Sequence, residues 1–377
     1  MVKQVVNPLT FKVDWLAFTI DENRDRKDGE DFYLLKKLGY DIDLFDEVSG
    51  KNFFNAGYQL GTGYVKIFFN AKDKPKQKGS SDMHNYIFTG VGCSDLFEKI
   101  NGDWLGLFQY LKDFGVSFRR IDCACNDTSN PPRVDFPLVE EKLAKKEFVS
   151  SKRKYNVIKD VNTNGDLIGE TIYYGSRGGS SGSGSKGSIL LRQYQKFLQM
   201  VSKHQESQMP IDAVRSGSWI RWELEITKAK AVAMVDLILE KQSIPEAYYA
   251  VLRDVIEFKE PTKNKKGEIY KNKSQWKVCA WWLDFLDNAE KGKLQNPEKI
   301  FDLGSALDWV KYSVVPTLQM LDEIYSDRLK FNIYDLLQDM PQREYSKKQQ
   351  RLMLETKYMS DDLLKLYLRQ FAGDDDA

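Results

Sequence analysis

Histidine is scarce in this chain. Only two occur among its 377 residues, His84 and His204. Zinc and related transition-metal sites in enzymes commonly use several imidazole ligands, so a histidine-rich metal site cannot be built here. A pair of catalytic histidines on neighbouring strand positions is missing as well. Any metal ion would therefore depend on carboxylate ligands.

Disulfide frameworks, long apolar runs and excess charge are also missing. Cys123 and Cys125, two of the four cysteines, alternate on one expected strand and cannot bond to each other comfortably, which favours a reducing cytoplasm. No apolar run approaches the ~20 residues needed to cross a membrane, and the first residues do not resemble a secretory signal. The net charge of +1 excludes a strongly basic nucleic-acid coat, so any DNA contact would come from local clusters.

The most informative stretch is 171–226. It contains three strand-like pieces, TIYYGSR, SILLRQYQK and SWIRWELEI, in which apolar and polar side chains alternate. This period of two is typical of a sheet with one buried face. The polar faces of the second and third pieces carry Arg192, Tyr194, Lys196, Arg221, Glu223 and Glu225.

An earlier segment, VSFRRIDCACND, adds a carboxylate to this set. Its apolar face, which includes Ile121 and Cys123, is expected to pack against helices. Asp122 lies on the other face, where the small side chain of Ala124 leaves room around it. We therefore predict that Asp122 belongs to the same site.

These residue types together suggest phosphoryl transfer. A tyrosine hydroxyl, with a pKa near ~10, is a poor nucleophile at neutral pH, and neighbouring cations favour the phenolate. Arg192 and Lys196 flank Tyr194 on the same face. A phosphate could be held by these cations and Arg221, while Asp122, Glu223 and Glu225 offer the oxygen ligands that Mg²⁺ or Mn²⁺ takes. The alternative is a set of exposed cross-strand pairs, and the residues alone leave both interpretations open.

Two segments beside the site are candidates for DNA contact. Lys152, Arg153 and Lys154 precede Tyr155, and cations around an aromatic ring suit single-stranded DNA, although an ordinary exposed edge has the same composition. Arg177 ends the YYGSR motif and is a further candidate. The glycine-serine run 178–187 lacks the spacing of a phosphate-binding P-loop, and we interpret it as a mobile hairpin loop.

The motifs, taken in order, resemble those of the replication initiation factor family. They are VDWLAFTI, RRIDCACND, TIYYGSR with LLRQYQK, and RWELEI, followed by WWLDFLDNAE and ALDWVKYSVVPTL in the later part. The family includes initiators of staphylococcal rolling-circle plasmids, relaxases of certain conjugative transposons and filamentous-phage initiators. The resemblance extends from about Phe11 to Met320.

The resemblance implies an enzyme that nicks and rejoins DNA in a bacterial host cell. Family members cleave one strand with a tyrosine, stay attached through a 5′-phosphotyrosine and leave a 3′-hydroxyl primer, using acidic metal ligands. The nucleophile maps onto Tyr194 and the ligands onto Asp122, Glu223 and Glu225. Ten residues separate YYGSR from the next strand and can alter the register, so Tyr174, or Tyr173 beside it, is an alternative nucleophile.

The resemblance implies that the protein binds DNA, both the origin duplex and a single strand. A host helicase and a second copy of the chain are further candidate partners, and no membrane association is expected. Two other functions stay open: a conjugative relaxase with the same chemistry, and a non-catalytic origin-binding regulator.

We predict an α+β fold, with a largely antiparallel central sheet, helices packed on one face and a helical C-terminal region. The catalytic domain is expected over residues 1–258 and the helical region over 275–377.

Overall fold

The fold is described from a computed structural model, over residues 9–76, 82–176, 188–290, 293–294, 302–330, 332–341, 344–345, 347–357 and 359–372. It divides into two compact units. The first contains Met1–Gln199 and Pro210–Glu298, and the second contains Met200–Met209 and Lys299–Ala377.

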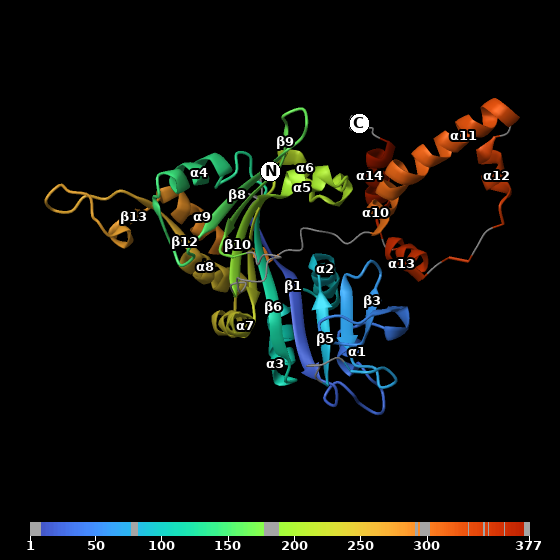
Figure 1. Cartoon of the computed structure of the whole chain (residues 1–377), viewed down its shortest axis with the longest axis horizontal. Helices are drawn as coiled ribbons and strands as arrows, with labels where there is room; N and C mark the ends of the chain where they lie inside the picture. The colour runs from blue at the N-terminus through green and yellow to red at the C-terminus, as the bar shows by residue number, and fades with distance from the viewer. Residues whose placement is uncertain are drawn as a thin grey trace. The chain divides into compact units, whose positions relative to one another are not determined.

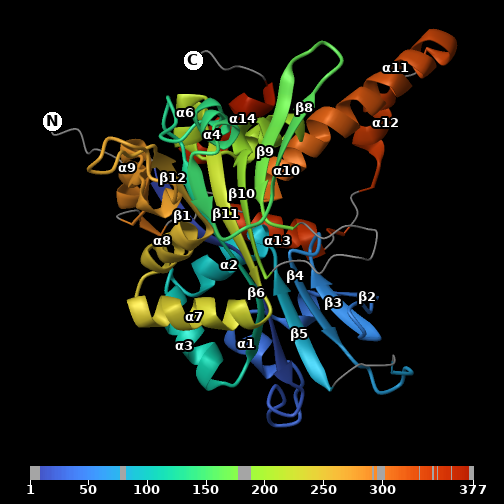
Figure 2. The same ribbon diagram turned by 60° about the vertical axis from the view of Figure 1, so that its left-hand side comes forward.

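A large sheet forms the centre of the first unit (Figures 1 and 2). Its order is β2-β3-β4-β5-β1-β6-β11-β10-β9-β8, and every neighbouring pair along it is antiparallel, as the sequence predicted. The strands are β1 (Leu9–Asp21), β2 (Asp46–Ser49), β3 (Ala56–Leu60), β4 (Val65–Phe69), β5 (Met83–Phe88), β6 (Ser117–Asp127), β8 (Tyr155–Val161), β9 (Leu167–Tyr174), β10 (Ile189–Gln195) and β11 (Ile220–Thr227). The short β14 (Lys293–Leu294) adds a parallel pairing to β1.

Helices cover the apolar face of β6 and β11 (Figure 2). They are α3 (Trp104–Asp113), α7 (Ala229–Lys241), α8 (Ile244–Val255) and α9 (Ala280–Glu290). Trp222 of β11 carries much of this packing, because its ring lies 5.4 Å from that of Trp282 and its carbonyl accepts a hydrogen bond from Tyr248. Burying such large rings contributes heavily to stability, and it fixes which face of β11 points away from the helices.

A second, three-stranded sheet has the order β13-β12-β7, from β7 (Phe148–Ser150), β12 (Ile256–Glu260) and β13 (Lys277–Val278). This small sheet packs against α9 through Phe258. The ring centroid of Phe258 lies 5.2 Å from that of Trp281 and 5.0 Å from that of Trp282. The other helices of the first unit are α1 (Tyr33–Lys37), α2 (Gly90–Lys99), α4 (Phe136–Ala144), α6 (Ile211–Ser216) and most of α5 (Lys196–Ser202).

The second unit is helical. Its longer elements are α10 (Asp302–Trp309), the π-helical turn Val310–Val314, α11 (Val315–Leu329), α12 (Ile333–Asp339), α13 (Lys347–Thr356) and α14 (Asp361–Ala372). The sequence placed the start of a helical region at 275, whereas the compact units divide at Glu298. The difference arises because Trp282 and Phe285 of α9 pack against Trp222 in the first unit.

Helix α2 begins at Gly90, shortly after β5 ends at Phe88. Ser94 lies inside this helix and donates its hydroxyl to the Gly90 carbonyl at 3.0 Å.

Candidate nucleic-acid nicking site

Three carboxylates meet on the face of the sheet that the core helices leave uncovered. Glu225 of β11 pairs with Asp122 of β6, and Glu223 pairs with Ala124. On its other side, Glu223 pairs with Arg192 of β10. Asp122, Glu223 and Glu225 are only 1%, 4% and 4% exposed. The strands that carry these residues are neighbours in the sheet, as the sequence predicted.

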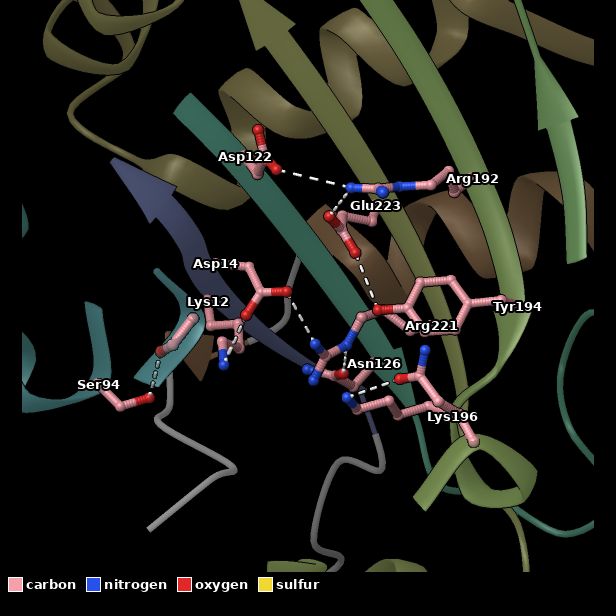
Figure 3. Close-up of polar contacts among 12 residues, drawn as sticks. Lys12, Asp14, Ser94, Asp122, Asn126, Arg192, Tyr194, Lys196, Arg221 and Glu223 are labelled. Carbon is pink, nitrogen blue, oxygen red and sulfur yellow. Dashed lines mark hydrogen bonds and ion pairs between the residues drawn. The ribbon is translucent and has the colours of Figure 1, made fainter. Parts of the chain in front are cut away.

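Two guanidinium groups lie among these carboxylates (Figure 3 shows Arg192 linked to Asp122 and Glu223). Arg120 donates from Nε and Nη2 to the two oxygens of Asp122, at 2.8 and 2.6 Å, and its Nη2 lies 3.2 Å from Glu225. Arg192 is hydrogen-bonded to Glu223, and its Nη2 lies 3.6 Å from Asp122 and 3.8 Å from Glu225. The sequence analysis did not identify Arg120, although it stands two positions before Asp122 on the same strand.

The carboxylate cluster favours added positive charge. Burial raises the pKa of Asp122 to about 7, even though Arg120 acts in the opposite direction. In the described part of the chain, no group of three His, Cys, Asp or Glu side chains is arranged as a metal cage. The donor chemistry suits a hard divalent cation, and in the present arrangement the two arginines supply the compensating charge.

Tyr194 lies at the edge of this cluster. Its half-buried hydroxyl donates to Oε2 of Glu223 at 2.9 Å (Figure 3), and Arg221 is its partner across β10 and β11. Burial raises the pKa of Tyr194 well above its ordinary value; Arg221 opposes the rise and Glu223 adds to it. The phenol is therefore held protonated, with an acceptor for its proton already in contact.

Arg221 is held by a buried network. It is 1% exposed, and it donates from Nε to Oδ1 of Asn126 at 2.7 Å and from Nη1 to Oδ2 of Asp14 at 2.9 Å. Trp219 donates from Nε1 to the same Asn126 oxygen at 2.9 Å. The sequence suggested that Arg221 holds a phosphate, but its guanidinium is engaged with Asn126 and Asp14. Its positive charge acts on Tyr194 across the strand pair.

Asp14 is a site residue that the sequence analysis missed. A register shift between Val13 and Trp15 interrupts the pairing of β1 with β6 at this position. Lys12, which is 3% exposed, lies 2.8 Å from Asp14 Oδ1. A signal was present in FKVDWLAFTI, since its large core residues stand at odd positions before Asp14, Phe11 and Val13, and at even positions after it, Leu16, Phe18 and Ile20. An extra residue in a strand produces such a change.

Lys196 does not continue β10 as expected. The strand ends at Gln195 and α5 begins at Lys196, so the alternation of sides stops one residue earlier than predicted. The ammonium group bonds to Gln199 at 3.0 Å and lies 5.6 Å from the centre of the Trp219 ring, against which Arg221 also packs at 5.2 Å. Lys196 therefore still lies at the Tyr194 end of the site.

The alternative tyrosines of β9 point to opposite faces. Tyr173 pairs with Arg192 and shares the carboxylate-bearing face, whereas Tyr174 pairs with Leu191 on the core face. Tyr174 is 1% exposed, stacks on Trp222 at 6.5 Å, and has a pKa raised well above its ordinary value by burial. A nucleophile in that position would be separated from the carboxylates by the sheet.

The predicted DNA-contact residues are spread more widely. Arg153 and Lys154 are exposed, and Lys152 is half-buried with a pKa lowered by that burial. Tyr155 is 40% exposed but pairs with Tyr174, so it lies on the face opposite to Tyr194. Arg177 and the glycine-serine run 178–187 lie outside the described residues.

Comparisons with known proteins identify the family. The sequence profile of the family described as "Replication initiation factor" matches residues 116–340, which include three of the four strands that carry the site. The chain belongs to this family. The chain is 25% identical over 369 residues to a protein named "Putative DNA relaxase NicK" from Bacillus subtilis (strain 168), covering 95% of this chain and 92% of that one.

A solved structure has the same fold. It is that of a rolling circle replication initiator protein from Geobacillus stearothermophilus, and it matches with a TM-score of 0.59 and 22% identity over 76% of this chain and 99% of that chain. No helix in the described part of the chain is both long and apolar enough to cross a membrane.

Proposed function

We propose that this replication initiation factor nicks one DNA strand at an origin and rejoins it, acting as a rolling-circle initiator with Tyr194 as the nucleophile. The observation that carries the proposal is the 2.9 Å hydrogen bond from the Tyr194 hydroxyl to Glu223, beside a cluster of buried carboxylates. The hydroxyl of Tyr194 contacts a buried carboxylate, whereas Tyr174 is buried on the core face of the sheet.

In the proposed reaction Glu223 accepts the phenol proton as Tyr194 attacks phosphorus. The P–O3′ bond breaks, the new bond forms a 5′-phosphotyrosine, and the proton is passed to the 3′ oxygen, so that atoms and charge balance. Arg221 favours the transient phenolate, because its guanidinium is fixed opposite Tyr194. Arg192 and Lys196 stand two positions before and after Tyr194 in the sequence, and we propose that they hold the scissile phosphate, Arg192 exchanging its bond to Glu223 for the phosphate.

We further propose that Asp122, Glu223 and Glu225 hold Mg²⁺ or Mn²⁺ during this reaction. The support is that carboxylate oxygens are the ligands these ions prefer, and that the strand pairing brings the three carboxylates together on one face of the sheet. When bound, such an ion polarises a phosphoryl oxygen and offsets developing negative charge.

The DNA strand is proposed to be held by the basic segment 152–154, directly before β8. Arg153 and Lys154 are exposed and Lys152 is half-buried, so their charges are open to phosphates at least in part. Arg177 belongs to the same proposal. Recruitment of a host helicase and formation of a homodimer stay predictions.

The test is incubation of the protein with supercoiled plasmid that carries the origin, with Mg²⁺ or Mn²⁺ and with chelator. We expect nicked plasmid and a covalent protein–DNA adduct with wild type. Tyr194→Phe is expected to abolish both, and Tyr174→Phe is the matched control that retains them. Nicking without any adduct, or no nicking by wild type, would exclude the proposed reaction, and the second outcome would favour an origin-binding regulator.

A relaxase of a conjugative element is the second candidate function, favoured by the similarity to the protein named a putative DNA relaxase. A relaxase and a replication initiator would use the same chemistry but would cut at different DNA sites. Mapping the nick on the DNA of the element that encodes the protein separates the two, since a relaxase cuts at a transfer origin.

A further inference from the structure

The segment between β12 and β13 is a built hairpin (residues 261–277), which we name the basic hairpin. Figure 1 shows it projecting from the rest of the first unit. Lys263 bridges to Ile269, and the Tyr270 amide donates to the Thr262 carbonyl at 3.0 Å. The side chain of Asn264 accepts two amide hydrogen bonds, at 2.8 and 3.1 Å, and these close the turn at its tip.

The base of the basic hairpin is also fixed. Trp276 donates from Nε1 to the Tyr270 carbonyl at 2.7 Å, and the Lys277 amide donates to Thr262 Oγ1 at 2.8 Å. Lys273 reaches the Lys146 carbonyl at 2.6 Å, at the end of α4. Because the segment is ordered before any partner binds, little conformational freedom is lost on binding.

The basic hairpin concentrates positive charge. It contains six lysines and one glutamate, a net charge of +5, in a chain whose total is +1, so the remaining residues sum to −4. Lys263, Lys265, Lys266 and Lys271 are exposed. None of these four forms an ion pair with any residue that the structure describes. The lysines are thus available to an external polyanion.

The basic hairpin does not line the Tyr194 face. It leaves the small sheet through β12, and Phe258 of β12 packs on α9, which covers the opposite, apolar face. A phosphate bound there would belong to DNA away from the nicked nucleotide. The bridge at Lys263 and Ile269 and the 3-10 turn Lys273–Gln275 hold the hairpin in a compact form. Its exposed lysines can contact the phosphates of a DNA backbone, which supply most of the affinity of non-specific DNA binding.

We propose that the basic hairpin binds the phosphate backbone of duplex DNA flanking the nick site. The inference rests on the proposed function only because it assumes a nick site. Binding of the hairpin to duplex DNA can be measured whether or not the protein nicks DNA.

The test replaces the four exposed lysines together, K263Q, K265Q, K266Q and K271Q. The matched control removes four exposed lysines from the other end of the chain, K27Q, K36Q, K37Q and K51Q. Binding of both variants and wild type to labelled random-sequence duplex and to labelled oligo-dT is measured by fluorescence anisotropy over a range of salt concentrations. Circular dichroism checks that both variants are folded.

We expect the duplex affinity of the hairpin variant to be lower than that of wild type by about tenfold or more at ~0.1 M salt. The slope of log K against log salt should fall by about 0.9 for each phosphate that the variant no longer neutralises. Oligo-dT binding should change by less than about twofold, and the control variant should match wild type on both probes.

Three results would overturn the proposal. They are unchanged duplex binding, an equal loss on both probes, and an equal loss in the control variant. Unchanged duplex binding would indicate that the lysines serve an acidic protein partner instead. The two proposals can fail separately. If wild type nicks no plasmid but only the hairpin variant loses affinity for duplex DNA, the proposed function is wrong and the basic hairpin is still a duplex-binding surface.

Discussion

Replacing Asn126 tests how the site is held together. Oδ1 of Asn126 accepts hydrogen bonds from Arg221 and from Trp219, and all three side chains are at most 1% exposed. Asn126→Leu keeps the approximate volume and leaves two buried donors without this acceptor. Losing a charge-assisted bond costs about 1.5–3 kcal/mol, and stranding a neutral buried donor about 1–3 kcal/mol. We expect a total loss of about 3–5 kcal/mol in the free energy of unfolding.

The assay is urea denaturation followed by tryptophan fluorescence, with Asn126→Asp as the control that retains an acceptor oxygen. Asn126→Leu should also shift the pH dependence of nicking to higher pH, because Arg221 is then less firmly fixed opposite Tyr194. A destabilisation below about 1 kcal/mol, with an unchanged pH profile, would refute the view that Asn126 positions Arg221.

Two further predictions concern carboxyl groups. Glu223→Gln should slow single-turnover nicking by about 10²–10⁴-fold at unchanged DNA affinity, because the proton acceptor of Tyr194 is lost; a rate within about threefold of wild type would argue against that role. Burial raises the pKa of Asp127, so its folded form binds a proton more tightly than the unfolded chain does. The stability that Asp127 contributes is therefore present at acidic pH and is lost as pH rises through its raised pKa. As pH rises through the raised pKa, the free energy of unfolding of Asp127→Asn should decline less than that of wild type, and parallel curves would contradict this.

The faces of the strands were predictable from local alternation. Ile121 and Cys123 are buried on one side of β6 while Asp122 faces the other, because a strand places neighbouring side chains on opposite faces. The same alternation placed Arg192 and Tyr194 together. Family motifs then indicated that these strands belong to one site, which local patterns cannot do.

Partners across the sheet were not predictable. Register between strands far apart in the chain is set by packing of the whole sheet, so the contact of Arg120 in β6 with Glu225 in β11 could not be derived from the sequence. The same holds for the contact of Arg221 with Asp14, which is 207 residues away. Lys196 was misplaced for a local reason, since the change from strand to helix occurs at that residue.

The most direct test of the central claim identifies the residue that carries the DNA after cleavage. The covalent adduct is digested with nuclease and trypsin, and the modified peptide is found by mass spectrometry. Tyr194 lies on the short peptide Gln193–Lys196, whereas Tyr173 and Tyr174 both lie on Asp160–Arg177. We predict the nucleotide on Gln193–Lys196; its presence on Asp160–Arg177 would contradict the assignment of Tyr194 as the nucleophile.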